Sequence, residues 1–436
     1  MSTYLRKCLD IAPTAVITPG PNVPNDYRNL RLQPWWPALR ATTSHLRLIA
    51  DWPSLQHSAG PPGSAPADLP CLDALDKQLE AAHADGMEII LFPYRYPRWA
   101  NGTLGIPDGP SNWNFEPWDR HARYQQYVDF LAGRRPQQTW KAWEYRMPLD
   151  GFGPDSAWGR YVAWLWERYA DRLTAFEVVN EPNLQVWPQR SPVDTDDLAA
   201  KWGTEGTHLV ITPAVAEMMT TVDALAKTHP GPLLLAPSCS DSDIDDIPRS
   251  TTISHSNEHA DSADPFAESL LSHLEQRGFK ADDRWIWAFH NYADIERDQH
   301  HIAHLRRLLI ERRWSGRQLD GGPELWATEG GCRPNALNST TGRIRLALGR
   351  ALTTAEQLEY QAIVLTEGLS RHHRAKGDGI GVGLMTQYTT YTDGFNSGVL
   401  ETAASGGAPR PALAAWCAMP EYVAAPVQRA AWRAQP

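Results

Sequence analysis

The feature that most constrains this chain is a repeated alternation between short apolar runs and longer amphipathic stretches. Parallel strands buried on both faces give such apolar runs, and the helices that connect them give the amphipathic stretches. We expect eight strands, at residues 16–18, 45–50, 87–93, 175–179, 233–236, 285–289, 324–328 and 382–385. We expect helices at residues 71–85, 157–173, 214–228, 354–370 and 411–418.

This order of elements predicts an α/β fold, a closed (β/α)8 TIM barrel with long βα loops. The alternative is an open doubly wound sheet, which would carry a Gly-rich phosphate-binding turn after an early strand. The sequence has no such turn. Only residues 386–436 follow the eighth apolar run, too few for a second domain. We therefore expect one catalytic domain over residues 1–436, with roughly the last 20 residues as a C-terminal tail.

Charge and hydropathy exclude two kinds of partner. The formal net charge is −10 and no Lys/Arg-rich stretch offsets it, which argues against nucleic acid. No apolar stretch approaches the length of a membrane span. Residues 1–18 lack the apolar core and cleavage site of a signal peptide, so a cytoplasmic protein is expected. The oligomeric state is not predicted by the sequence.

Cysteine and histidine usage predicts no metal and no cofactor. The five cysteines are widely spaced without a CxxC pair, which fits free thiols better than disulfides or a zinc site. His255 and His259 stand at helical spacing near Asp261, a pattern that could hold a metal ion. A solvated loop is the favoured interpretation, because no buried strand lies in this segment to fix ligand geometry.

Aromatic residues are abundant, with 19 Trp and 14 Tyr. Their flat rings can stack on the C–H faces of sugars, or they can pack the core and the loops. Trp52, Tyr94 and Trp99 follow the second and third apolar runs. We expect Trp52 and Trp99 to bind substrate, with loop packing as an equally good alternative for both.

Two glutamates follow apolar runs at positions that would meet across a barrel. Glu181 comes after the fourth run, within Asn-Glu-Pro-Asn, and Glu329 ends the seventh, before Gly-Gly. Active sites of these barrels lie at the C-terminal ends of the strands. A carboxyl pair placed there can hydrolyse a glycosidic bond, and its separation decides between retention and inversion. The alternative role for both glutamates is structural ion pairing.

The segments around these glutamates resemble clan A glycoside hydrolases. Residues 176–183 (FEVVNEPN) resemble the fourth-strand signature of that clan, and residues 326–331 (WATEGG) resemble its seventh-strand signature. The helix that begins WGRYV at Trp158 also looks like the clan, and like family 39 in particular, with family 5 next. The resemblance runs through the whole barrel in order, although only these segments are specific.

The resemblance implies a (β/α)8 barrel and a retaining glycosidase that acts on carbohydrate. It implies that Glu181 is the general acid/base and Glu329 the nucleophile. It also implies that Asn180 binds the sugar 2-hydroxyl and that Arg47, taken to end the second strand, lies beside Glu329. A nearby cation would lower the pKa of Glu329 and keep this carboxylate ionised.

Two further segments bear on substrate binding. The clan's His/Tyr segment after the sixth strand matches His290 and Tyr292, and the resemblance implies that the tyrosine hydroxyl binds the nucleophile. The eighth strand departs from the clan, which usually has a Trp there as a floor for the sugar. Here Gln387 and Tyr388 stand in that region and are expected to contact substrate.

Three functions remain open at this level. The first is hydrolysis by double displacement through a covalent intermediate on Glu329. The second is transglycosylation on the same fold, and the third is carbohydrate binding without catalysis. The presence of both glutamates counts against the third. Sugar, linkage, anomer preference, and exo or endo action are not determined by the sequence.

Overall fold

The computed structural model describes residues 5–11, 26–102, 104, 147–182, 206–240, 265–297, 301–340, 342–374, 382–392 and 396–418. Eight parallel strands close into a barrel in the order β1-β10-β9-β6-β5-β4-β3-β2. The strands are β1 (Arg6–Asp10), β2 (His45–Asp51), β3 (Glu88–Tyr94), β4 (Ala175–Glu177), β5 (Leu233–Leu235), β6 (Trp285–His290), β9 (Leu325–Glu329) and β10 (Val382–Tyr388). The predicted (β/α)8 barrel is therefore confirmed.

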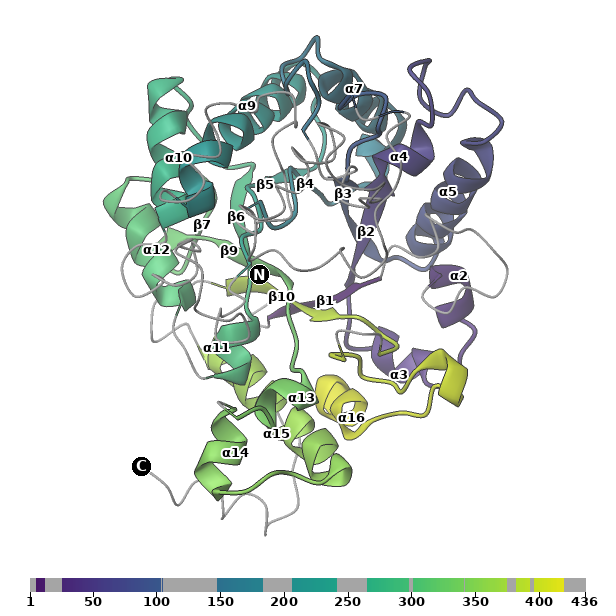
Figure 1. Cartoon of the computed structure of the whole chain (residues 1–436), viewed down its shortest axis with the longest axis vertical. Coiled ribbons are helices and arrows are strands. Elements are labelled where there is room, and N and C mark those ends of the chain that lie inside the picture. The colour runs from purple at the N-terminus through teal and green to yellow at the C-terminus, as the bar shows by residue number, and fades with distance from the viewer. Residues whose placement is uncertain are drawn as a thin grey trace, which may run out of the picture.

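Helices surround the strands, as Figure 1 shows in a view that looks into the barrel. The helices of four or more residues are α2 (Tyr27–Leu30), α3 (Trp36–Arg40), α4 (Trp52–Leu55), α5 (Leu69–Ala84), α7 (Ala157–Tyr169), α9 (Gly206–Thr228), α10 (Pro265–Gln276), α11 (Tyr292–Glu296), α12 (His301–Glu311), α13 (Pro334–Leu337), α14 (Arg343–Leu348), α15 (Thr354–Arg374) and α16 (Pro411–Ala418). All five predicted helices are present, and α16 has the predicted bounds. No described helix has the length and apolar character needed to cross a membrane.

The first barrel strand lies earlier than predicted. Residues 6–10 form β1 and close the barrel by pairing with both β10 and β2, whereas residues 16–18 lie outside the described residues. Charged residues concealed this strand in the sequence. The Arg6 guanidinium lies 4.7 Å from the ring centroid of Trp326 and binds Glu324, and Lys7 donates to the backbone carbonyl of Trp416. Each charge is thus satisfied at the rim of the barrel.

The interior of the barrel is apolar at its centre and charged toward one end. The apolar layer consists of eight fully buried side chains: Cys8, Ile90, Ala175, Leu235, Ile286, Ala288, Trp326 and Leu384. Because side chains alternate along a strand, the next inward positions toward the C-terminal ends carry Asp10, Glu177 and His290. The charged layer thus lies at the end where the active sites of such barrels are found.

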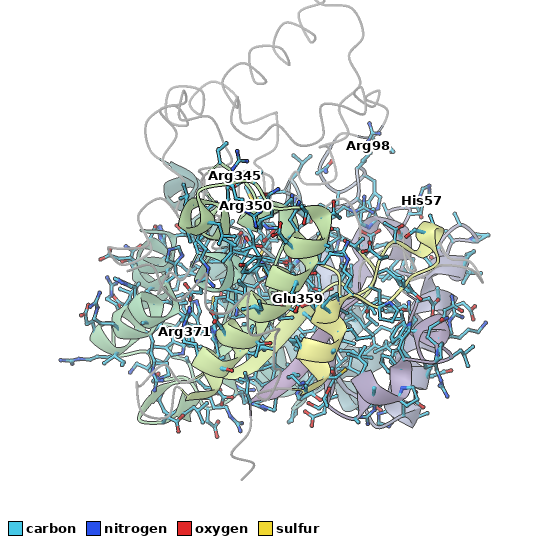
Figure 2. All side chains as sticks on the ribbon, turned by 90° about the horizontal axis from the view of Figure 1, so that it is seen from below. His57, Arg98, Arg345, Arg350, Glu359 and Arg371 are labelled. Atoms are coloured by element: carbon cyan, nitrogen blue, oxygen red, sulfur yellow. The ribbon has the colours of Figure 1, made fainter. Side chains whose placement is uncertain are left out.

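The loops that follow the strands gather at that same end. His57 and Arg98 come after β2 and β3, and Arg345 comes after β9; all three lie toward one end of the molecule in Figure 2. Arg371, in the last turns of α15, lies further toward the opposite end (Figure 2). A short hairpin, β7 (Gln318–Leu319) with β8 (Gly322–Pro323), was not predicted and lies outside the barrel sheet.

Candidate active site

Glu181 lies in a tight turn after β4. Its backbone N–H donates to the Ser238 carbonyl at 2.9 Å, and Asn180 forms a parallel bridge with the same serine. The φ angle of Glu181 is +42°, in the left-handed region that a non-glycine residue rarely adopts. Backbone strain of this kind concentrates at functional sites, where the surrounding structure holds it in place. The carboxyl group is turned into the barrel mouth and is largely buried.

Glu329 reaches the same space because β9 contains an irregularity. In the pairing of β6 with β9, Phe289 faces Ala327 but His290 faces Glu329, so Thr328 is an extra residue. An extra residue of this kind changes the face of the strand to which the following side chain points. Without it, strict alternation after the inward-facing Trp326 would point Glu329 away from the barrel interior.

The two glutamates share one space. One carboxylate oxygen of Glu181, one of Glu329 and a ring nitrogen of His290 all lie within 4.8 Å of one another. Both glutamates are 8% exposed, so they are accessible to a small group and otherwise covered. Side chains from strands distant in sequence therefore face each other across a gap of a few ångströms.

Arg47 connects four of the polar groups around this gap. Its Nε and Nη2 donate to the two oxygens of Glu177 at 2.8 Å each, and Nη2 also donates to Asn180 Oδ1 at 2.6 Å. Its Nη1 donates to Asp10 Oδ2 at 2.5 Å and to Glu329 Oε2 at 3.2 Å. Arg47 does not end its strand as expected: it is the third of seven residues in β2 and points into the barrel.

Glu329 receives a second hydrogen bond from the start of α11. The Tyr292 hydroxyl donates to Glu329 Oε1 at 2.9 Å, so each carboxylate oxygen accepts from a different donor. The ring of Tyr292 meets Tyr388 edge-on, with centroids 6.4 Å apart. Tyr388 faces the barrel mouth and is partly exposed, in the region where the sequence departs from the clan.

The electrostatics of Glu329 differ from the expectation. The pKa of Glu329 is raised to about 7, chiefly by burial and also by the charges of Glu181 and Asp10, against the lowering effects of His290 and Arg47. Arg47 lowers the pKa of Glu329, as the resemblance implies, but burial of the carboxyl group outweighs this effect. Burial raises the pKa of Glu181 to about 7 as well, against a lowering effect of the Ser240 hydrogen bond.

His290 bridges the two glutamates. Its Nδ1 lies 2.8 Å from Glu181 Oε1 and its Nε2 lies 3.7 Å from Glu329 Oε2. Burial lowers the pKa of His290 to about 4, so the imidazole is neutral near pH 7. A neutral ring can donate a hydrogen bond from Nδ1 to a carboxylate or, in its other tautomer, accept a hydrogen bond there from a carboxylic acid. The contact with Glu181 is therefore compatible with both protonation states of that group.

Three residues predicted to bind substrate make contacts within the protein. Trp52 is fully buried, stacked on Tyr161 with centroids 5.1 Å apart, so it has no free face for a sugar. Trp99 packs edge-on against Trp52 and donates to the Gln56 carbonyl. Gln387 is fully buried.

Gln387 faces outward because β10 extends to Tyr388. Leu384 belongs to the apolar layer inside the barrel, so alternation turns Tyr388 inward and Gln387 toward the surrounding shell. The Gln387 amide donates to the carbonyl of Ser397 at 2.8 Å and to that of Tyr388 at 2.7 Å. It therefore anchors the loop after β10.

The sequence analysis missed four residues of the site. Asp10 and Glu177 hold Arg47, Ser238 donates to Glu177 at 2.5 Å, and Ser240 hydrogen-bonds Glu181. Ser238 and Ser240 follow the fifth strand, where the rule used for the glutamates applies equally. Asp10 carried no such signal, because its strand was not recognised.

Among the described residues, the donor atoms of Glu181, His290 and Glu329 are close enough together to hold a metal ion. Arg47 lies 3.2 Å from one of these donors and would repel a second cation there. The segment with His255, His259 and Asp261 lies outside the described residues.

Comparisons with known proteins find similarity at the level of structure. No protein-family model and no curated protein sequence matches the chain. A family 39 glycoside hydrolase from Bacteroides cellulosilyticus WH2 has a TM-score of 0.47 at 15% identity, over 95% of this chain and 63% of that one. A triple mutant of an endo-β-1,4-glucanase from Xanthomonas axonopodis pv. citri has a TM-score of 0.47 at 13% identity, over 98% and 99%. A β-glucosidase from Thermotoga maritima has a TM-score of 0.46 at 11% identity, over 95% and 97%.

The chain thus spans 63% of the length of that family 39 enzyme. At identities and scores this low, the function has to be inferred from the residues of the site.

Proposed function

We propose that this protein is a retaining glycoside hydrolase of the clan A type, with Glu181 as general acid/base and Glu329 as nucleophile. The observation that carries the proposal is the approach of their carboxylate oxygens to within 4.8 Å. Retention needs carboxyl groups about 5–5.5 Å apart, whereas inversion needs about 6.5–9.5 Å to admit a water molecule. The gap therefore favours direct attack by one carboxylate on the anomeric carbon.

The hydrogen-bond partners of the two glutamates indicate which one is the nucleophile and which one is the acid/base. Glu329 accepts from a guanidinium and from a phenol, which both favour its ionised form. Glu181 has the neutral His290 and a serine hydroxyl as neighbours, and no cation in direct contact is described. When one proton is shared by the pair, it resides on Glu181. Two coupled buried carboxyls titrate as a unit, so activity requires this singly protonated state.

The reaction follows from that state. Glu329 attacks the anomeric carbon while Glu181 transfers its proton to the leaving oxygen, and a glycosyl ester forms on Glu329. The ionised Glu181 then removes a proton from water, which hydrolyses the ester and restores both groups. Asn180 accepts from Arg47 through Oδ1, so its NH2 group remains as a donor for a sugar hydroxyl.

Leaving-group dependence tests both roles. Glu329→Gln should abolish turnover of every substrate. Glu181→Ala should retain activity on 2,4-dinitrophenyl glycosides, whose leaving group needs no proton, and lose it on alkyl glycosides and natural oligosaccharides. A panel of hexosides and pentosides supplies the probes, and NMR of the first product formed reports its anomeric configuration.

The outcomes separate the alternatives. Equal loss on both leaving-group classes in Glu181→Ala would contradict the acid/base role, and an inverted product would contradict the nucleophile. Products extended onto an added alcohol or sugar acceptor, in place of hydrolysis, would indicate a transglycosylase. Oligosaccharide binding without any product from the wild type would contradict catalysis.

A further inference from the structure

One nitrogen of Arg47 serves two carboxylates. Arg47 Nη1 donates to Asp10 Oδ2 at 2.5 Å and to Glu329 Oε2 at 3.2 Å. The shorter contact goes to Asp10. The other two nitrogens of the guanidinium are bound to Glu177 and Asn180. Asp10 therefore competes with Glu329 for the only part of Arg47 that reaches Glu329.

Asp10 is built into the floor of this site. It ends β1 and pairs in register with Arg47 on one side and Tyr388 on the other. It is 1% exposed, and its Oδ1 has no hydrogen-bond partner among the described residues. A buried carboxylate oxygen without a partner destabilises the protein, so a role in stability alone does not account for an aspartate at this position.

The surroundings of Asp10 carry an excess of negative charge. The titratable and charged groups around it come from β1, β2, β4 and the turn after it, β6, α11, β9 and β10: Cys8, Arg47, Glu177, Glu181, His290, Tyr292, Glu329 and Tyr388. Four carboxyl groups thus surround one guanidinium. Burial raises the pKa of Asp10 to about 6, and Arg47 lowers it.

We propose that Asp10 is a positioning residue for the nucleophile: by binding Arg47 Nη1 it keeps the guanidinium from pairing fully with Glu329, and so keeps Glu329 reactive. This inference rests on the proposed function. A carboxylate held in a close ion pair is a weaker base and a weaker nucleophile. When Glu329 becomes a neutral ester, Asp10 and Glu177 still hold Arg47 in place.

The decisive variant is Asp10→Asn, which keeps the shape and one acceptor for Arg47 but removes the charge. Arg47 should then pair more closely with Glu329, whose pKa falls. In a plot of kcat/KM against pH, the acid limb should move to lower pH by about one unit. The maximal value of kcat/KM should fall. The substrate is the 2,4-dinitrophenyl glycoside that the wild type turns over, because its cleavage needs only ionised Glu329.

Three further variants complete the test. Asp10→Glu restores the charge and should bring the acid limb back toward the wild-type pH. Asp51→Asn is the matched control: Asp51 is a buried carboxylate at the end of β2 that binds Arg95 at 2.7 Å and has no described contact with Arg47. Its acid limb should coincide with that of the wild type. If Asp10→Asn does not fold, Asp10→Ser carries the same test.

An unmoved or raised acid limb in the folded, charge-free variant would overturn the inference, as would an equal shift in Asp51→Asn. Failure of the proposed function is a separate result. If Glu329→Gln keeps turning over the dinitrophenyl glycoside, Glu329 is not the nucleophile, whatever Asp10 does.

Discussion

Replacing Glu329 by glutamine should stabilise the fold while it abolishes turnover. The pKa of Glu329 rises from 4.5 to about 7 in the folded protein because the group is buried among other carboxylates. Each unit of difference corresponds to about 1.36 kcal/mol, so ionisation of the folded protein costs about 3 kcal/mol of stability. A neutral amide of the same shape does not incur that cost.

The stability difference between Glu329→Gln and the wild type depends on pH. Because the folded pKa is higher than the unfolded one, the folded protein binds the proton more tightly. The stability associated with this proton is complete below the ordinary pKa of 4.5 and is lost as pH rises through about 7. Glutamine also weakens the hydrogen bonds at this position: its oxygen can accept from Arg47 and its NH2 group can donate to the Tyr292 hydroxyl, but bonds to a neutral amide replace bonds to a carboxylate, at a cost of about 1 kcal/mol. The net gain above pH 8 is about 2 kcal/mol.

Urea denaturation followed by tryptophan fluorescence measures this difference at pH 8.5 and at pH 5. Glu329→Gln should be more stable than the wild type at the higher pH, and the gain should vanish at the lower one. Glu356→Gln serves as the control: Glu356 is partly exposed, and its hydrogen bond with Arg350 lowers its pKa to about 2, so no gain is expected. A gain that is absent at pH 8.5, or identical at both pH values, would refute the electrostatic reasoning.

Two other substitutions separate site residues from structural ones. Tyr292→Phe removes the 2.9 Å hydrogen bond to Glu329. Because a hydrogen bond to a charged group is lost, kcat/KM should fall about ten- to hundredfold, and the acid limb of its pH profile should move to higher pH. An unchanged pH profile would argue against the contact. Gln387→Ala should lower the melting temperature, with a loss of stability of about 1 kcal/mol for each of two hydrogen bonds, because the carbonyls of Tyr388 and Ser397 each lose one of their two donors. KM should stay at the wild-type value in Gln387→Ala, and a large rise would return Gln387 to the substrate site.

The sequence by itself determined the order of elements and the two glutamates. Apolar runs long enough to be buried on both faces predict parallel strands, and the glutamates follow the fourth and seventh runs. Local pattern suffices here because strand burial and strand-end position are properties of neighbouring residues. The same reasoning failed for β1, where Arg6 and Lys7 are satisfied by partners more than three hundred positions away in the chain.

Only the tertiary structure decided which side chains enter the site. A shift of one residue in a strand reverses the facing of every side chain, so the extra residue at Thr328 and the extension of β10 determine where Glu329, Gln387 and Tyr388 point. The pKa of Glu329 likewise depends on Asp10, which lies more than three hundred residues away in the sequence and accepts from the same nitrogen of Arg47. Barrel closure creates that contact, and no local pattern encodes it.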